Sequence, residues 1–313
     1  MTTGEEGYLS DFALIPFDAL VLDTVDSHIF QSKLLWTPQL SVATYGGQLV
    51  AHAVESAYRA IEGNLRIHSL QVSFMNRGIS EDPTPITYRV QRLKTGRSVS
   101  VRGVEAFQGT RRILYAIAGF HKVEEGGLQH NFAQPHFVTS PAHTAEEMHA
   151  REQSIEEDRT TGSGRSLPVA RVHFKHIHAF TTCKSRSHDI WFRLGDETLV
   201  ALSAHTNIPL SRLHLVLAAW LSDFTVALSV FLSHERDVFD HLNLIASLNH
   251  TLYFHDPTAI RVNEWMLLDV SSPWSSWNRG LTEGKCFNAK GQLCFTAVQE
   301  NIVRTSKPFR SNL

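Results

Sequence analysis

The sequence has few cysteines and almost no net charge. Its three cysteines, Cys183, Cys286 and Cys294, show no C-x-x-C spacing, which argues against a disulfide-stabilised secreted fold and favours a reducing compartment. With 29 Lys+Arg against 31 Asp+Glu, the net charge is −2, so we expect no nucleic-acid partner bound through a basic surface. The first ten residues lack the basic and apolar regions of a signal peptide. A length of 313 residues favours two domains or a duplicated one.

One apolar run, residues 213–232, is long enough to cross a bilayer. Asp223 lies near its middle, where a carboxylate costs about 2.5–3.5 kcal/mol on insertion scales. We therefore expect no membrane span, but a helix over 211–232 that is buried in a folded core. Asp223 would then need either a partner or a chemical function, because an isolated buried carboxylate is costly.

The remaining pattern is a helix followed by strands, and it occurs twice. Apolar residues recur with helical spacing after Gly46 and Gly47, and alternating strands follow over 67–75, 85–93, 98–107 and 111–121. After the second helix, strands are expected over 245–255, 262–270, 275–287 and 292–303. The pattern predicts an α+β fold built from two repeats, each with a long helix wrapped by an antiparallel sheet.

Short matches between the halves indicate an internal duplication. Ile67-His68-Ser69-Leu70 aligns with Ile245-Ala246-Ser247-Leu248, and Arg102-Gly103 aligns with Arg279-Gly280. The predicted organisation is an N-terminal repeat over 1–121, a charged and glycine-containing linker over 122–188, and a C-terminal repeat over 189–313. Because unpaired sheet edges are usually covered, we expect the repeats to share one continuous sheet, with homo-oligomer formation left open.

Several short motifs occur in order along the two halves. They are Tyr45-Gly46-Gly47-Gln48, Thr95–Arg102, Leu221-Ser222-Asp223, Asn249–His255, Asn263-Glu264-Trp265, Asn278-Arg279-Gly280 and Val298-Gln299-Glu300. On these motifs the chain resembles the type II acyl-CoA thioesterases, over about 36–121 and 189–304. The resemblance implies a double hot-dog fold, an acyl-CoA substrate, hydrolysis to free acid and CoA, and no cofactor or metal.

The resemblance also implies a catalytic set of Asp223, Ser247 and Gln299, which together hold the hydrolytic water. A thioester carbonyl is already electrophilic, so one activated water can suffice without a covalent nucleophile. The carboxylate would polarise the water or take its proton, and the hydroxyl and amide would orient it.

Seven further residues are candidates for binding the substrate. Backbone N–H groups around Gly46, Gly47 and Gln48 could stabilise a developing oxyanion at the start of a helix. Arg97, Ser98 and Arg102 are either contacts for the CoA phosphates or exposed strand residues. His250 is either a contact at the site or a hydrogen-bonded structural histidine.

Departures from the family pattern leave the substrate class open. Met75-Asn76-Arg77-Gly78 replaces Leu-Arg-Pro-Gly, Asn249 replaces an Asp, and Ser247 stands where Thr is commoner. Two alternatives therefore stay open: a biosynthetic hot-dog enzyme, such as a hydratase or acyl-processing enzyme acting on an acyl or polyketide thioester, and a non-catalytic acyl-CoA binder.

Two remaining features concern metal binding and location. His173, His176 and His178 are close in sequence, but on a strand His173 points away from the other two, so no metal site is expected. The C-terminal Ser311-Asn312-Leu313 resembles the Ser-Lys-Leu peroxisomal address, with Asn in place of the basic residue. The sequence is thus compatible with a cytoplasmic or a peroxisomal protein.

Overall fold

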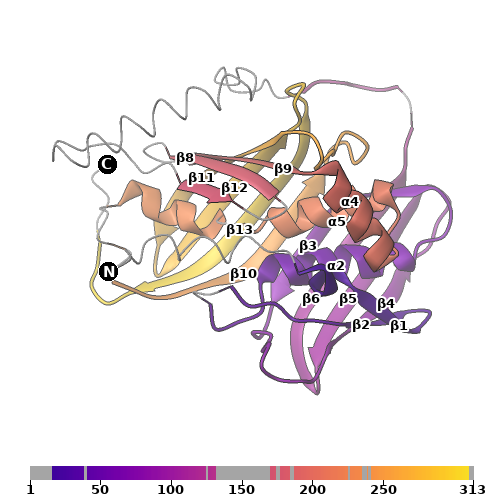
Figure 1. Cartoon of the computed structure of the whole chain (residues 1–313), viewed down its shortest axis with the longest axis horizontal. Helices are drawn as coiled ribbons and strands as arrows, with labels where there is room; N and C mark the ends of the chain where they lie inside the picture. Colours follow the sequence, from indigo (N-terminus) through magenta and orange to yellow (C-terminus); the bar gives the residue numbers. More distant parts are fainter. Residues whose placement is uncertain are drawn as a thin grey trace.

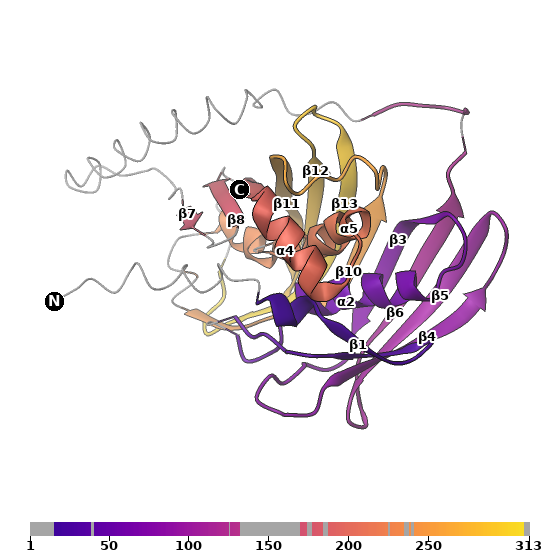
Figure 2. The same cartoon turned by 45° about the vertical axis from the view of Figure 1, so that its right-hand side comes forward.

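The computed structural model describes residues 16–38, 41–124, 126–131, 170–173, 177–183, 187–224, 226–234, 238 and 241–309. Within these residues thirteen strands form one sheet in the order β1-β2-β4-β5-β6-β3-β10-β13-β12-β11-β9-β8-β7 (Figures 1 and 2). Each neighbouring pair is antiparallel. Two helices, α2 and α5, pack against each other beside this sheet.

The N-terminal half contains the predicted helix and four strands, preceded by a short 3-10 helix and two further strands. Its elements are η2 (Phe17–Leu20), β1 (Leu22–Asp26), β2 (Ile29–Ser32), α2 (Gly46–Arg59), β3 (Leu65–Phe74), β4 (Ile86–Lys94), β5 (Val99–Gln108) and β6 (Arg111–Lys122). The inner face of this half is apolar, with the buried side of α2 lying against strand residues such as Ile67, Leu70 and Phe120. The α+β class predicted from the sequence is therefore confirmed.

The C-terminal half repeats the pattern with additional elements before it. They are β7 (Ala170–His173), β8 (Ile177–Cys183), β9 (Ser187–Leu194), α4 (Asp196–Thr206), α5 (Leu210–Leu221), η3 (Val226–Ser233), β10 (Leu242–Phe254), β11 (Met266–Ser276), β12 (Arg279–Phe287) and β13 (Leu293–Thr305). β7, β8 and the start of β9 fall in the range assigned to a linker, so this part of 122–188 is strand. β9 pairs with β11, β8 with β9 and β7 with β8, so these three strands extend the sheet beyond β11.

The two repeats meet at β3 and β10. These strands pair in antiparallel register from Ser73 opposite Asn249 to Ser69 opposite Tyr253. The expectation of one continuous sheet through both repeats is therefore confirmed. β1 and β7 form the two ends of the sheet as the structure describes it.

The predicted helix over 211–232 is interrupted. The α-helix ends at Leu221, where Ser222 Oγ lies 2.8 Å from the Ala219 carbonyl oxygen and the Phe224 N–H donates to the Leu221 carbonyl only three residues earlier. These contacts tighten the last turn, which is how many helices end. Asp223 consequently lies in the turn between α5 and η3, and not in the middle of a helix.

The apolar run over residues 210–231 has the length of a membrane-spanning helix, and its most apolar 18-residue window has a mean hydropathy of 1.7. However, 82% of its most apolar stretch is buried inside the protein, as expected for a core helix.

α2 and α5 run antiparallel. At one end the Tyr45 hydroxyl donates to the Trp220 carbonyl at 2.8 Å, and at the other Glu55 pairs with Arg212 at 2.8 Å. Glu55 also pairs with Arg59 at 2.7 Å within its own helix, yet burial still raises the pKa of Glu55 above its usual value. The start of α2 is thereby held against the end of α5, next to Asp223.

Candidate active site

Asp223 faces the first turn of α2. A Cβ atom added at Gly46 would lie 2.7 Å from Asp223 Oδ2, and the Gly47 N–H donates a hydrogen bond to the same carboxyl group. The N-terminus of a helix favours negative charge because its N–H groups are free and its dipole is positive there. The two glycines therefore let a carboxylate sit directly on the helix end.

The pKa of Asp223 lies in the neutral range. Burial raises this pKa to about 7, although hydrogen bonds from the Gln299 side chain and the Gly47 N–H act in the opposite direction. Asp223 is partly exposed, so its carboxyl group is not completely shielded from solvent. A base with this pKa can exchange protons at physiological pH.

Ser247 and Gln299 lie beside each other on β10 and β13. Gln299 Nε2 donates to Ser247 Oγ at 2.6 Å and to Asn301 Oδ1 at 2.9 Å. Ser247 and Asn301 are direct register partners, and Gln299 is two residues from Asn301, so all three share one face of the sheet. Gln299 also lies within hydrogen-bonding reach of Asp223, and its two amide protons are shared among these three acceptors. The structure therefore brings together the three residues predicted to be catalytic.

His250 lies behind Gln299. It is fully buried, with Nδ1 2.8 Å from Gln299 Oε1 and Nε2 2.9 Å from Ser222 Oγ. Burial lowers its pKa to about 4, so the ring is neutral. Both ring nitrogens have protein partners, Gln299 and Ser222. Of the two roles expected for His250, this arrangement favours the hydrogen-bonded structural histidine over the contact with substrate.

Asn301 was not identified from the sequence. It is fully buried, and its Nδ2 has no hydrogen-bond partner among the described residues. Its position two residues after Gln299 on the same strand is the signal that could have revealed it. The cluster therefore contains a donor in addition to the three predicted groups.

Gln48 has a structural role. Its Oε1 accepts from the Trp36 N–H at 2.9 Å, and its Nε2 donates to the carbonyls of Ala19 (2.9 Å) and Leu34 (2.6 Å). Its backbone N–H bonds the Tyr45 carbonyl. The side chain thus ties the segment before α2 to the helix, while Gly46 and Gly47 alone face Asp223.

Arg97, Ser98 and Arg102 lie at the opposite end of α2. Arg102 is buried and donates to the carbonyls of Ala60 (3.0 Å), Lys94 (2.7 Å) and Val101 (3.1 Å), so its guanidinium holds the C-terminal end of the helix. Arg97 and Ser98 are exposed in the turn between β4 and β5. The 14 residues of α2 span roughly 20 Å, so this trio is remote from Asp223.

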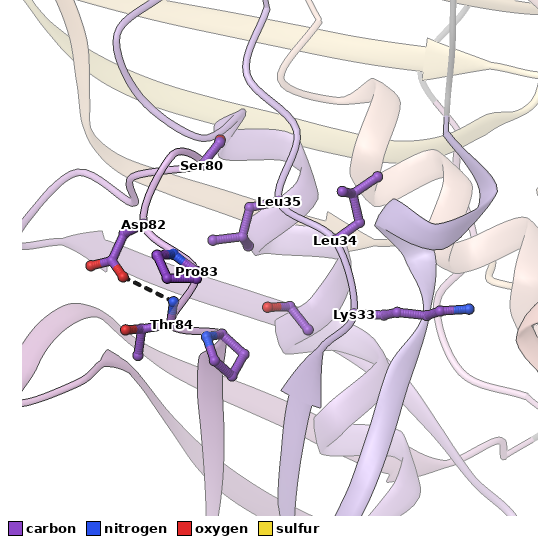
Figure 3. Close-up of a pocket in the computed structure, with 9 residues that line it drawn as sticks. Lys33, Leu34, Leu35, Ser80, Asp82, Pro83 and Thr84 are labelled. Carbon is purple, nitrogen blue, oxygen red and sulfur yellow. Dashed lines mark hydrogen bonds between the residues drawn. The ribbon is translucent and has the colours of Figure 1, made fainter.

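A pocket lies between the segment that follows β2 and the segment that precedes β4 (Figure 3). The Asp82 carboxylate accepts the Thr84 N–H at 2.9 Å in its rim, and Lys33 pairs with Asp18. Its lining is Ser32, Lys33, Leu34, Leu35, Ser80, Asp82, Pro83, Thr84 and Pro85, which includes none of the predicted site residues. The described residues hold no His, Cys, Asp or Glu cluster suited to a metal, and the side chains of His173, His176 and His178 lie outside the described part.

Comparison with known proteins matches both halves of the chain. The acyl-CoA thioesterase N-terminal domain model covers residues 35–121, and the acyl-CoA thioesterase model covers 193–302. Acyl-coenzyme A thioesterase 8 of Rattus norvegicus is 28% identical, over 92% of this chain and 88% of the relative. The peroxisomal acyl-coenzyme A thioester hydrolase 1 of Saccharomyces cerevisiae is 26% identical, over 85% and 87%.

A solved structure shows the same fold. Acyl-CoA thioesterase II TesB2 from Mycobacterium marinum superposes with a TM-score of 0.69 at 24% identity, over 94% of this chain and 98% of the other. Fold and matches together define a thioester hydrolase with a double hot-dog fold. The chain belongs to the type II acyl-CoA thioesterase family.

Replacing Gly47 should disturb the site through backbone contact. A Cβ atom there would overlap the Trp220 carbonyl oxygen and the Tyr45 ring, neither of which can move freely. We expect Gly47→Ala to lower the free energy of unfolding by about 1–3 kcal/mol, measured by urea denaturation, and to reduce activity. Gly195→Ala is the matched control, because its added methyl meets only Thr198 Oγ1 at 3.9 Å. Equal stability and activity of the two variants would show that the helix contact is unimportant.

Proposed function

We propose that the chain hydrolyses fatty-acyl or related acyl-CoA thioesters with a water molecule held and activated by Asp223, Ser247 and Gln299. The observation that supports this most directly is a carboxyl group with a pKa near 7, placed beside a hydroxyl and an amide. Family membership is in accord with this chemistry.

In the proposed reaction, the water oxygen attacks the thioester carbonyl carbon while its proton passes to Asp223. The C–S bond of the tetrahedral intermediate then breaks, and the leaving CoA sulfur takes the proton. Ser247 and Gln299 limit the orientations of the water, which lowers the entropic part of the barrier. The Gly46 N–H is the backbone donor we assign to the carbonyl oxygen, because Gly47 bonds Asp223 and Gln48 bonds Tyr45.

This geometry favours hydrolysis over the two alternatives from the sequence. A non-catalytic acyl-CoA binder has no need of a carboxyl group held near neutrality beside a hydroxyl and an amide. A hydratase of this fold would be expected to carry an Asp/His pair on the loop and helix start of one repeat, and Tyr45-Gly46-Gly47-Gln48 contains neither residue.

Cytoplasm and peroxisome are the two locations that fit the chain. A peroxisomal relative supports the second, and the C-terminal Ser311-Asn312-Leu313 lies outside the described residues. Formation of homo-oligomers stays a prediction from the sequence.

Asp223→Asn tests the catalytic base. The amide has nearly the same shape but cannot take a proton, so we expect kcat for acyl-CoA hydrolysis to fall about 10²–10⁴-fold with an unchanged unfolding midpoint. Release of CoA thiol across a panel of acyl chain lengths is the measurement. Glu62→Gln makes the same chemical change on an exposed carboxylate and should hydrolyse normally. Wild-type rates in Asp223→Asn would disprove the proposed base.

The pH dependence follows from the pKa of Asp223. Because burial disfavours the ionised form, the base is protonated and inactive below a pH of about 7. We expect kcat/KM to rise roughly tenfold per pH unit below 7 and to level off above it. The residual kcat/KM of Asp223→Asn should not show this rise with pH. A flat wild-type profile across neutrality would contradict the assignment.

The peroxisomal address is tested by fusing residues 304–313 to a fluorescent protein. Import should give puncta that disappear when Leu313 is deleted, because receptors read the final residues. A diffuse signal in cells with working peroxisomal import would exclude the address and leave the cytoplasm.

A further inference from the structure

We propose that His250 is a positioning residue that fixes the orientation of the Gln299 side-chain amide, so that its nitrogen faces Ser247 and Asp223. The inference rests on the proposed catalytic set, and it assigns His250 a role within that set.

The two ends of a glutamine amide have almost the same shape and opposite hydrogen-bonding character. In this structure Gln299 Nε2 faces Ser247 Oγ and Asn301 Oδ1, while Oε1 faces His250 Nδ1 at 2.8 Å. A half-turn of the amide would aim its carbonyl oxygen at the carboxylate of Asp223. That arrangement would remove a hydrogen bond from the base and repel its negative charge.

The state of His250 selects between these orientations. The ring is fully buried and neutral, so it carries one N–H. A proton on Nδ1 requires the Gln299 oxygen opposite it, whereas a proton on Nε2 would require the amide nitrogen there. The tautomer of His250 and the orientation of Gln299 are therefore coupled.

Ser222 completes this chain of contacts. Its Oγ lies 2.9 Å from His250 Nε2 and 2.8 Å from the Ala219 carbonyl, and a hydroxyl has one proton to donate. Gln299 Oε1 can only accept, so the neutral ring carries its proton on Nδ1, and Nε2 then accepts the Ser222 proton in place of the Ala219 carbonyl. Ser222 directly precedes Asp223, so the turn that positions the base also positions the residue that holds His250.

The charged and titratable groups around Asp223 define what a pH profile would report. Tyr45, which directly precedes α2, is buried and its pKa is raised, so it stays neutral, and His250 from β10 is neutral as well. Gln299 from β13 and the Gly47 N–H from α2 are the donors that lower the Asp223 pKa. Loss of the hydrogen bond from Gln299 should therefore raise the apparent pKa at which kcat/KM rises with pH.

The test compares two replacements of similar shape, His250→Asn and His250→Leu. Asn places an N–H where Nδ1 stands, whereas Leu places a methyl group there. We expect His250→Leu to lower kcat roughly 10–100-fold with little change in KM and to raise the apparent pKa of kcat/KM. His250→Asn should restore most of the rate and the wild-type profile.

Unfolding midpoints and two further variants complete the experiment. His255→Leu, one residue beyond the end of β10, is the control, because His255 is exposed and its Nε2 lies 2.8 Å from Thr296 Oγ1. If His250→Leu does not fold, Ser222→Ala tests the same chain and should shift the profile in the same direction. In a double variant with Gln299→Ala, His250→Leu should add no further loss.

Three results would overturn the inference. They are equal kinetics of the Asn and Leu variants, an unchanged pH profile in His250→Leu and Ser222→Ala, and additive losses with Gln299→Ala. Failure of the catalytic set itself is recognised separately, since Asp223→Asn would then hydrolyse at the wild-type rate.

Discussion

The contact between the start of α2 and the end of α5 is the constraint on which the site depends. Gly47 lies so close to the Trp220 carbonyl that no side chain fits between the two helices, and Tyr45 bonds the same carbonyl. This approach sets the positive end of one helix beside Asp223, in the turn that follows the other. It also encloses the carboxyl group enough to bring its pKa to about 7.

Because α2 and α5 are antiparallel, the start of each helix lies beside the end of the other, and the two ends of the pair differ. At one end the glycines of α2 meet Asp223, with Ser247 and Gln299 on the adjacent strands. At the other end Arg102 fills the end of α2 by bonding the Ala60 carbonyl, and Glu55 pairs with Arg212. One end thus carries a chemical cluster, and the other stabilises the pair of helices.

The polar cluster at the active end is costly to bury unless its members bond one another. Ser222, His250, Gln299, Ser247 and Asn301 form such a connected set through hydrogen bonds of 2.6–2.9 Å. One donor, Asn301 Nδ2, remains without a described partner. A network of this kind orients its members more strictly than apolar packing, as the proposed water-holding role of Ser247 and Gln299 requires.

Periodicity in the sequence determined the strands 67–121 and 245–303, the helix after Gly46 and the duplication, because local alternation and helical spacing are set by which face is buried. The motif resemblance indicated Asp223, Ser247 and Gln299. Only the tertiary structure decided that the second helix stops at Leu221, and that β7 and β8 join the sheet. It also showed that two of the predicted binding residues have different surroundings, since Arg102 bonds backbone carbonyls and His250 bonds Gln299. These outcomes depend on contacts between segments distant in sequence, which no local pattern records.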